Sequence, residues 1–171
     1  MSNIKFSIII PLFNKEFYIR NTINSVLAQS YNNFELIIVD DCSTDNSYNI
    51  VKNFDDVRIR LFRNDQNRGV GFTRNKGIEL STGDYIIFLD ADDEFIHEDL
   101  LERLSIFIEK YKSQYIMLTR RYSDKTVKPN FESIRKYLRH TKDNDFYKID
   151  DNVNVAILGN FQLSPYNCVK W

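Results

Sequence analysis

Residues 84–94 read DYIIFLDADDE, an apolar run that ends abruptly in a cluster of carboxylates. A short apolar run of this kind predicts a buried strand. Similar runs occur earlier in the chain, at 4–10 and 34–39, and a run with alternating polarity occupies 57–62. Segments with the features of helices separate these runs. The alternation predicts an α/β fold with a mostly parallel sheet and helices on both faces.

The segments between the runs carry apolar residues at helical spacing or residues that cap helices. Ser43 or Thr44 can cap a short helix that runs through Val51. Beyond residue 119 the pattern loosens, and no linker rich in Pro, Gly or Ser marks a domain boundary. The predicted helices are 15–29, about 43–51, 69–80, one from about residue 97 onwards and 132–139; further strands are predicted at 115–119 and 153–158.

Composition excludes several classes of protein. The 171 residues include 23 basic and 24 acidic side chains and are 43% hydrophobic. A balanced charge argues against a protein built to bind nucleic-acid phosphates, and the apolar content argues against a disordered chain. No apolar run approaches the ~20 residues of a membrane-spanning helix. Cys42 and Cys168 make no disulfide framework and no signal peptide opens the chain, so we expect a cytoplasmic protein.

The acidic cluster at 90–94 is the sharpest chemical signal. Its crowded carboxylates repel one another, and a divalent cation would offset that repulsion. Mg²⁺ and Mn²⁺ take oxygen ligands, usually one or two carboxylates together with substrate phosphates. In an extended backbone Asp90 and Asp92 would point the same way, with Ala91 opposite. The alternative is a solvated acidic loop that stabilises the N-terminus of the next helix.

Other polar residues follow the remaining predicted strands. In an open parallel sheet, ligands bind beyond the carboxyl ends of the strands. Asp40 and Asp41 end the second run, where a carboxylate could accept an N–H group of a nucleobase or cap a turn. Gly69 and Gly71 begin a dinucleotide fingerprint, but position 74 is Arg74 instead of a third glycine, and no Walker phosphate loop occurs. Arg74 suits a ligand phosphate or, alternatively, an exposed salt bridge.

Several short motifs follow one another at set distances along the first two thirds of the chain. They are SIIIPLFNKE at 7–16, LAQS at 27–30, IVDDCSTD at 38–45, NRG at 67–69, TRNKGI at 73–78, GDYI at 83–86 and FLDADD at 88–93. In order and spacing they resemble glycosyltransferase family 2, of the bacterial surface-polysaccharide kind with the GT-A fold. The resemblance covers about residues 4–112.

The resemblance implies an inverting transferase that moves a sugar from a nucleoside-diphosphate donor, usually UDP-linked, with Mn²⁺ or Mg²⁺. The acceptor would be a glycan or a lipid-linked glycan in capsule or lipopolysaccharide synthesis. Residues 1–119 would form the donor-binding core, and residues 120–171 the start of an acceptor-side region. One alternative is a donor-binding fragment without transfer activity. A nucleotidyltransferase is a weaker one, because such enzymes usually carry a Gly-rich basic loop where this chain has PLFN.

The resemblance also assigns roles to individual residues. Asp41, with Asp40 as the second candidate, would read the uracil edge. Asp90 and Asp92 match the D-x-D motif, with Asp92 the better candidate for direct metal contact. Cys42 stands where the family commonly has glycine. The other positions matching the nucleotide-sugar site are Pro11, Phe13, Asn14 and Glu16 near the nucleoside, and Asn67 and Arg74 along the nucleotide.

The catalytic base stays unassigned. In the family it lies well beyond the D-x-D motif, and residues 164–171 look like the beginning of that acceptor region, cut short. No motif selects among the carboxylates of the second half, which are Asp143, Asp145, Asp150 and Asp151. The segment 120–148 carries nine basic and four acidic residues, a local charge of +5. A solvated face is the simpler interpretation, and peripheral contact with the inner face of the cell membrane is the alternative.

Overall fold

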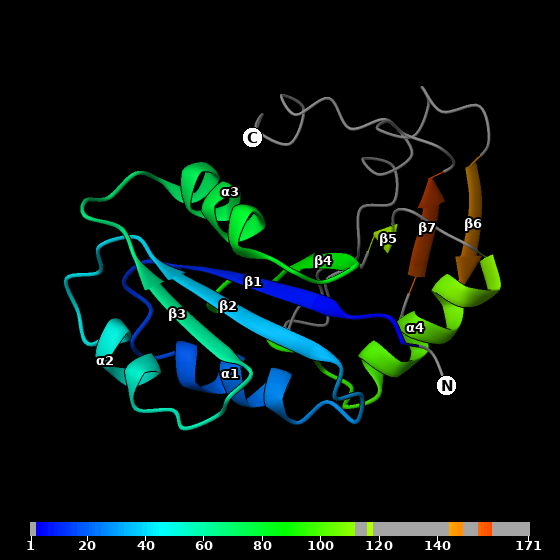
Figure 1. The fold of residues 1–171 in the computed structure, drawn as a ribbon, viewed down its shortest axis with the longest axis horizontal. Coiled ribbons are helices and arrows are strands. Elements are labelled where there is room, and N and C mark those ends of the chain that lie inside the picture. Colours follow the sequence, from blue (N-terminus) through cyan, green and yellow to red (C-terminus); the bar gives the residue numbers. More distant parts are fainter. Residues whose placement is uncertain (1–2, 112–115, 118–143, 149–153, 159–171) are drawn as a thin grey trace, which may run out of the picture. The chain divides into compact units, whose positions relative to one another are not determined.

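The structure, a computed structural model, describes residues 3–111, 116–117, 144–148 and 154–158 (Figure 1). The chain divides into two compact units, residues 1–106 and 107–171. The first contains the predicted parallel sheet and nearly all the residues that the sequence singles out.

The sheet of the first unit has four parallel strands in the order β3-β2-β1-β4 (Figure 1). The apolar runs therefore form strands as expected. After β3 the chain crosses to the other side of β1, so the strand order reverses between β1 and β4. In open α/β sheets, ligands bind beyond the carboxyl ends of the strands at such a switch point. The strands are β1 (Phe6–Leu12), β2 (Phe34–Asp40), β3 (Ile59–Arg63) and β4 (Tyr85–Phe88).

Helices cover both faces of this sheet, which confirms the predicted α/β architecture. Figure 1 shows α1 and α2 on one face and α3 on the other. The stripe of Ile19, Ile23 and Val26 on α1 is fully buried, as its helical spacing predicts. The helices are α1 (Ile19–Leu27), α2 (Ser47–Lys52), α3 (Val70–Leu80) and α4 (Leu100–Tyr111).

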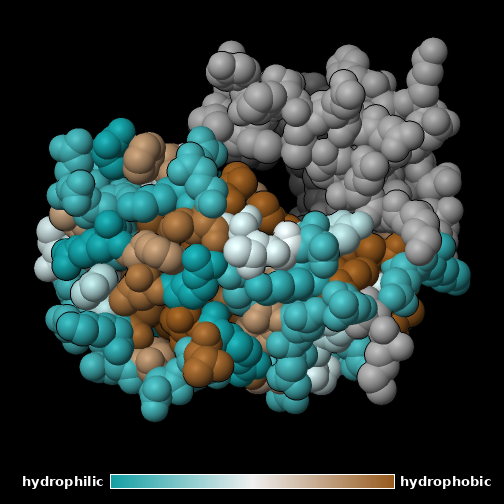
Figure 2. Space-filling model, viewed as in Figure 1, coloured by the Kyte–Doolittle hydropathy of each residue, from teal (hydrophilic) through white to brown (hydrophobic). Residues whose placement is uncertain are grey.

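The core on the α3 side centres on Ile9, Ile37 and Val39, which are completely buried. Gly77 lets α3 approach β1 closely, because a Cβ atom at this position would overlap the side chain of Ile9. The surface in Figure 2 is largely hydrophilic over the first unit, with hydrophobic side chains between the polar ones. Exposed apolar side chains of this kind are normal on folded proteins.

Several boundaries differ from the prediction; α1, for example, begins at Ile19 instead of residue 15, after a turn. Two of the differences have identifiable reasons. Strand β1 continues through Pro11, although proline lacks an N–H group. Pairing of β1 with β4 ends at Ile9, and the proline nitrogen faces the side that β4 no longer occupies. Helix α2 begins at Ser47 instead of after Ser43 or Thr44, because residues 41–46 form a loop held by polar side chains.

The second unit contains a three-stranded antiparallel sheet in the order β5-β7-β6. The strands predicted at 115–119 and 153–158 are present as β5 (Ile116–Met117) and β7 (Asn154–Leu158). Strand β6 (Asn144–Lys148) was not predicted, because its sequence NDFYK has no clear apolar alternation. The helix predicted at 132–139 lies outside the described residues. Within the described residues, no helix has the length and apolar character needed to cross a membrane.

Candidate functional site

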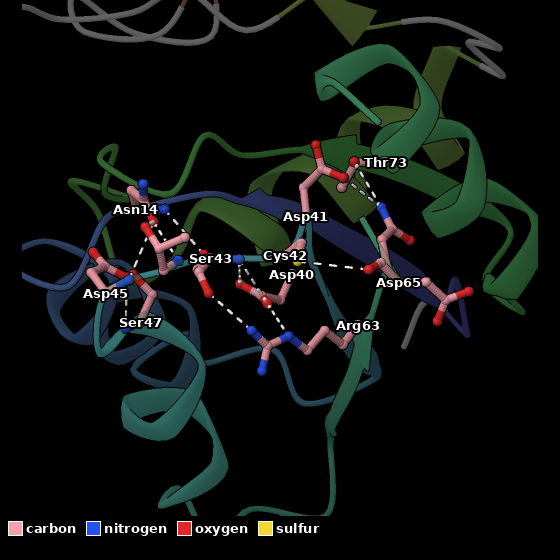
Figure 3. A network of polar contacts seen from close by, with 12 residues as sticks. Asn14, Asp40, Asp41, Cys42, Ser43, Asp45, Ser47, Arg63, Asp65 and Thr73 are labelled. Atoms are coloured by element: carbon pink, nitrogen blue, oxygen red, sulfur yellow. Dashed lines mark hydrogen bonds and ion pairs between the residues drawn. The ribbon is translucent and has the colours of Figure 1, made fainter. Parts of the chain in front are cut away.

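The loops that follow β1 and β2 are locked together by side-chain hydrogen bonds (Figure 3). The Oδ1 atom of Asn14 accepts hydrogen bonds from the backbone N–H groups of Thr44, at 2.8 Å, and Asp45, at 3.4 Å. Glu16 accepts one from the N–H of Asn46 at 2.9 Å and donates its own N–H to Asp45 at 3.0 Å. Two residues predicted to line the nucleoside therefore also build the loops that would surround it.

Asp40 is buried and holds the turn at the end of β2. Its carboxylate pairs with the Nε atom of Arg63 at 3.1 Å and accepts a hydrogen bond from the N–H of Ser43. Arg63 also donates to the carbonyl oxygen of Ser43 at 2.9 Å. These contacts match the turn-capping alternative for Asp40.

Asp41 points the other way and ties β2 to the start of α3. Its Oδ1 atom accepts hydrogen bonds from Asn64 Nδ2 at 2.8 Å and from the N–H of Arg68 at 2.9 Å. Its Oδ2 atom accepts one from the N–H of Gly69 at 2.8 Å. Burial alone would raise the pKa of Asp41, but these hydrogen bonds outweigh burial and lower the pKa below its usual value. Asp41 is therefore a carboxylate at neutral pH, and its role in base recognition stays a prediction.

Cys42 adopts a left-handed backbone conformation, with φ of 62°. This conformation is unfavourable for residues with a Cβ atom and free of strain for glycine. The backbone therefore gives a physical reason for glycine at this position of the family. The Sγ atom lies 3.8 Å from the carbonyl oxygen of Asp65 (Figure 3).

The D-x-D motif forms a turn, so the expectation of an extended backbone is wrong. Strand β4 ends at Phe88, and the N–H of Asp93 closes the turn on the carbonyl of Asp90 at 2.9 Å. Ala91 is buried, whereas the side chains of Asp90 and Asp92 are 36% and 40% exposed. Both carboxylates are thus presented at the carboxyl edge of the sheet.

Three polar side chains on and just after α1 hold the chain that carries this motif. Thr22 donates its hydroxyl to the carbonyl of Ala91 at 2.9 Å, and Ser25 accepts the N–H of Phe95 at 3.0 Å. Gln29 donates to the carbonyl of His97 at 2.7 Å, and its Oε1 accepts the N–H of Leu101 at 3.1 Å. Sequence analysis assigned none of them a role. For Gln29 a signal was available, because it lies in the LAQS motif.

Each carboxylate of the D-x-D motif pairs with a basic side chain from another element. Arg74 on α3 contacts Asp90 at 2.7 Å, which is the salt bridge foreseen as the alternative role of this arginine. Lys15, after β1, contacts Asp92 at 2.7 Å. The hydrogen bond to Asp92 raises the pKa of Lys15 above its usual value. Sequence analysis missed Lys15, although it lies between Asn14 and Glu16.

The remaining predicted residues lie in the same region. Pro11 is near the carboxyl end of β1, and Phe13 follows it with an exposed ring. Asn67 precedes α3 and accepts the N–H of Gly69 at 3.1 Å. All predicted site residues therefore lie at the carboxyl edge of the sheet or on α3, which begins at that edge.

In the part of the chain that the structure describes, the D-x-D motif offers a metal two carboxylates. Within the described residues, no group of three or more His, Cys, Asp and Glu side chains could hold an ion. Asp90 and Asp92 do fit a Mg²⁺ or Mn²⁺ site of the kind that phosphate oxygens and water complete. The buried Nε atom of Arg74 has no hydrogen-bond partner among the described residues, which also fits an anion beside this pair.

Comparison with known sequences identifies the class of protein that this site belongs to. Residues 7–164 match the family described as Glycosyl transferase family 2. The chain belongs to this family and has its GT-A fold.

Its relatives include named bacterial glycosyltransferases. The chain is 40% identical over 103 residues to the Escherichia coli UDP-Glc:alpha-D-GlcNAc-diphosphoundecaprenol beta-1,3-glucosyltransferase WfgD, covering 60% of this chain and 41% of WfgD. It is 32% identical over 118 residues to the Staphylococcus aureus poly(ribitol-phosphate) beta-N-acetylglucosaminyltransferase TarS, covering 67% of this chain and 20% of TarS. The chain spans less than half the length of the curated relatives it matches.

Solved structures agree with the family. The crystal structure of S. aureus TarS residues 1–349 in complex with UDP-GlcNAc superimposes with a TM-score of 0.67 and 28% identity, covering 82% of this chain and 39% of that structure. A Pyrobaculum calidifontis mannosyltransferase in complex with GDP-Man and Mn²⁺ has a TM-score of 0.58 at 20% identity, covering 70% of this chain and 36% of that one. The second likeness concerns the fold alone.

Proposed function

We propose that residues 1–119 bind a nucleoside-diphosphate sugar, with UDP as the nucleotide, at the carboxyl edge of the parallel sheet. The observation that carries this proposal is the position of Asp90 and Asp92, which lie at the switch point between β1 and β4 beside Arg74 and Lys15. Family membership supports it, as do the UDP-linked donors in the names of WfgD and of the TarS complex.

The protein to which this domain belongs would transfer the sugar to a glycan or lipid-linked acceptor in bacterial surface-polysaccharide synthesis, with inversion at the anomeric carbon. When the C–O bond to the donor phosphate breaks, negative charge develops on the leaving diphosphate. A bound Mn²⁺ or Mg²⁺ would stabilise that charge as a Lewis acid. The guanidinium of Arg74 and the ammonium of Lys15 supply further positive charge at the same edge, and Asp41 and Asn14 keep the surrounding loops in place.

Few residues of the proposed acceptor-side region are among those that the structure describes. Deprotonation of the acceptor hydroxyl needs a general base, commonly Asp or Glu. Asp145 lies in β6, while Asp143, Asp150 and Asp151 lie outside the described residues. We keep residues 120–171 as the proposed acceptor-side region, with the base unassigned. A donor-binding domain without transfer activity is the second candidate.

Calorimetric titration tests donor binding. UDP, UDP-GlcNAc, UDP-Glc and GDP are each titrated with and without Mn²⁺. The proposal expects the uridine nucleotides to bind more tightly than GDP, and more tightly with Mn²⁺ than without. Equal or tighter binding of GDP would contradict the assignment of the nucleotide, and no binding of any of them would contradict the function. A transfer assay on this chain beside a longer family member separates a transferase from a binding domain.

Most of the basic segment at 120–148 lies outside the described residues, so its role also stays a proposal. Each basic side chain near an anionic bilayer contributes about 1 kcal/mol, and salt screens this attraction. If the cytoplasmic protein contacts the inner face of the membrane, it will sediment with anionic vesicles at low salt and not with neutral ones. Replacing Arg135, Lys136 and Arg139 by Gln will reduce that binding. Absence of binding to either vesicle leaves a solvated basic face.

A further inference from the structure

The ion pair between Lys15 and Asp92 bridges the two loops at the switch point of the sheet. Lys15 follows β1, Asp92 follows β4, and Nζ lies 2.7 Å from Oδ2. The pair therefore lies where the fold places ligands, and it involves the carboxylate that the family pattern selects for metal contact. The ammonium group of Lys15 thus pairs with the carboxylate that is assigned to the metal.

The backbone of Lys15 is held by hydrogen bonds, whereas its side chain is partly exposed. Its N–H donates to the hydroxyl of Ser47 at 2.8 Å, and its carbonyl accepts the N–H groups of Tyr18 and Ile19, each at 3.0 Å. The side chain is 37% exposed and that of Asp92 40% exposed. Exposed pairs of this kind contribute little to stability, so exchange of the partner is easy. Nζ also lies over the ring of Tyr18, 5.8 Å from the ring centroid.

A lysine and a divalent cation compete for the same carboxylate. Two positive groups beside one carboxylate repel each other, so a metal at Asp92 would displace the ammonium or bind less tightly in its presence. The neighbouring carboxylate has the same arrangement, because Arg74 pairs with Asp90 at 2.7 Å. A diphosphate changes this balance, since its oxygens offer both basic side chains a new anionic partner.

We propose that Lys15 is a positioning residue that couples donor binding to metal binding, pairing with Asp92 until a divalent cation takes that carboxylate and then pairing with the donor's diphosphate. This inference rests on the proposed function. The inference means that the metal and the nucleotide are thermodynamically coupled: each raises the affinity of the protein for the other by the same factor. Lys15 contributes to that factor in two ways. It weakens binding of the metal alone, and once the metal is bound it strengthens binding of the nucleotide.

The test is a thermodynamic cycle on the full chain with Mn²⁺ and UDP as probes. Electron paramagnetic resonance gives the Kd of Mn²⁺ alone, and calorimetry gives the Kd of UDP with and without Mn²⁺. In Lys15→Met we expect Mn²⁺ alone to bind about three- to tenfold more tightly, the size expected for removing one charge near a divalent ion at an exposed site. We expect UDP alone to bind as it does to wild type, because Lys15 stays paired with Asp92 when no metal is present, and the coupling factor to fall by about tenfold.

Two further variants serve as controls. Lys15→Arg retains the charge and should keep most of the coupling, while Lys52→Met removes one exposed charge from the end of α2 and should change nothing. Thermal unfolding verifies that each variant is folded. If wild-type protein binds UDP with Mn²⁺ and Lys15→Met has an unchanged coupling factor, the inference is wrong while the proposed function stands. If wild-type protein binds no UDP under either condition, both are wrong.

Discussion

At the amino edge of the sheet the Glu35 carboxylate is buried among several hydrogen-bond donors, whereas at the carboxyl edge the side chains of Asp90 and Asp92 are partly exposed and each pairs with one basic side chain. Glu35 accepts hydrogen bonds from Ser7 Oγ at 2.7 Å, from the N–H of Thr82 at 2.6 Å and from Arg60 at 2.6 Å. The same chemical pair, a carboxylate and a basic side chain, thus occurs at both edges, with the carboxylate buried at one edge and partly exposed at the other.

The two edges differ in how easily water or an ion can replace the groups that bind the carboxylate. Burial would raise the pKa of Glu35, but the hydrogen bonds from Ser7, Thr82 and Arg60 lower it to about 2. Gly83 closes the site further, because a Cβ atom there would lie 2.7 Å from the carbonyl oxygen of Lys5. Water and ions cannot easily substitute for these donors. A carboxylate with exchangeable partners, as at Asp92, is suited to binding, and one with fixed partners to stability.

The largest expected effect is loss of stability in Glu35→Gln. The amide keeps the shape but removes the charge, and it places an N–H₂ group against donors. Breaking a buried, hydrogen-bonded pair costs about 3 kcal/mol or more in the free energy of unfolding. Urea denaturation measures this, with Glu79→Gln, an exposed position on α3, as the matched control. A loss below about 1 kcal/mol would remove the contrast between the two edges.

The second effect is acid sensitivity that originates at the amino edge. The pKa of Glu35 is about 2 in the folded protein and 4.5 ordinarily, so its stabilisation is complete above pH 4.5 and is lost as pH falls towards 2. This group alone accounts for about 3 kcal/mol over that interval. Urea midpoints at pH 6, 4.5 and 3 should fall less steeply in Glu35→Gln than in wild type. Part of the slope will remain, because the pKa values of Asp41, Asp45 and Asp56 are also lowered.

The third effect separates binding from stability at the carboxyl edge. Asp92→Asn should leave the free energy of unfolding within about 1 kcal/mol, because it removes only an exposed ion pair. Mn²⁺-dependent binding of UDP should weaken by at least the ~10–100-fold that loss of an outer-shell partner causes at metal sites. Glu94→Gln removes one charge from the same cluster and serves as the control. A variant that unfolds, or that binds UDP as wild type does, would contradict the role of Asp92.

The sequence predicted the sheet well because burial there depends on local pattern. The apolar runs containing Ile9, Ile37 and Phe88 all form strands, and their order of appearance with helices implies parallel pairing. The start of α2 was misplaced, because capping residues at 43–44 are instead bound by Asn14 from another loop. That competition depends on tertiary contacts, which no local pattern contains.

The residues of the candidate site also divide into those that a local sequence pattern reveals and those that only the fold reveals. Asp90 and Asp92 were found from crowding of like charges in the sequence, a local signal. Lys15 and Gln29 act through partners 77 and 72 residues away, so their roles emerge only from the fold. Strand β6 was missed because its sequence lacks apolar alternation, and its pairing with β7 supplies what the pattern does not.

The smallest effect concerns backbone strain, which also distinguishes the two edges. Among the described residues, positive φ occurs at Asn14, Cys42 and Gly69, all in loops of the carboxyl edge. Cys42→Gly should stabilise the protein by about 0.5–1 kcal/mol, because relief of the left-handed strain, ~1–2 kcal/mol, exceeds the added freedom of the unfolded chain.

Asn14→Gly provides the opposite case at a similar backbone angle. Its φ is 49°, but its Oδ1 atom accepts the N–H of Thr44 and that of Asp45, which glycine cannot replace. It should therefore destabilise by about 1–2 kcal/mol despite the same relief of strain. Thermal denaturation of the two variants measures both changes. If Cys42→Gly also destabilises, the contact of its thiol with the Asp65 carbonyl outweighs the strain, and the loop at Cys42 is held by its side chain as firmly as the loop at Asn14.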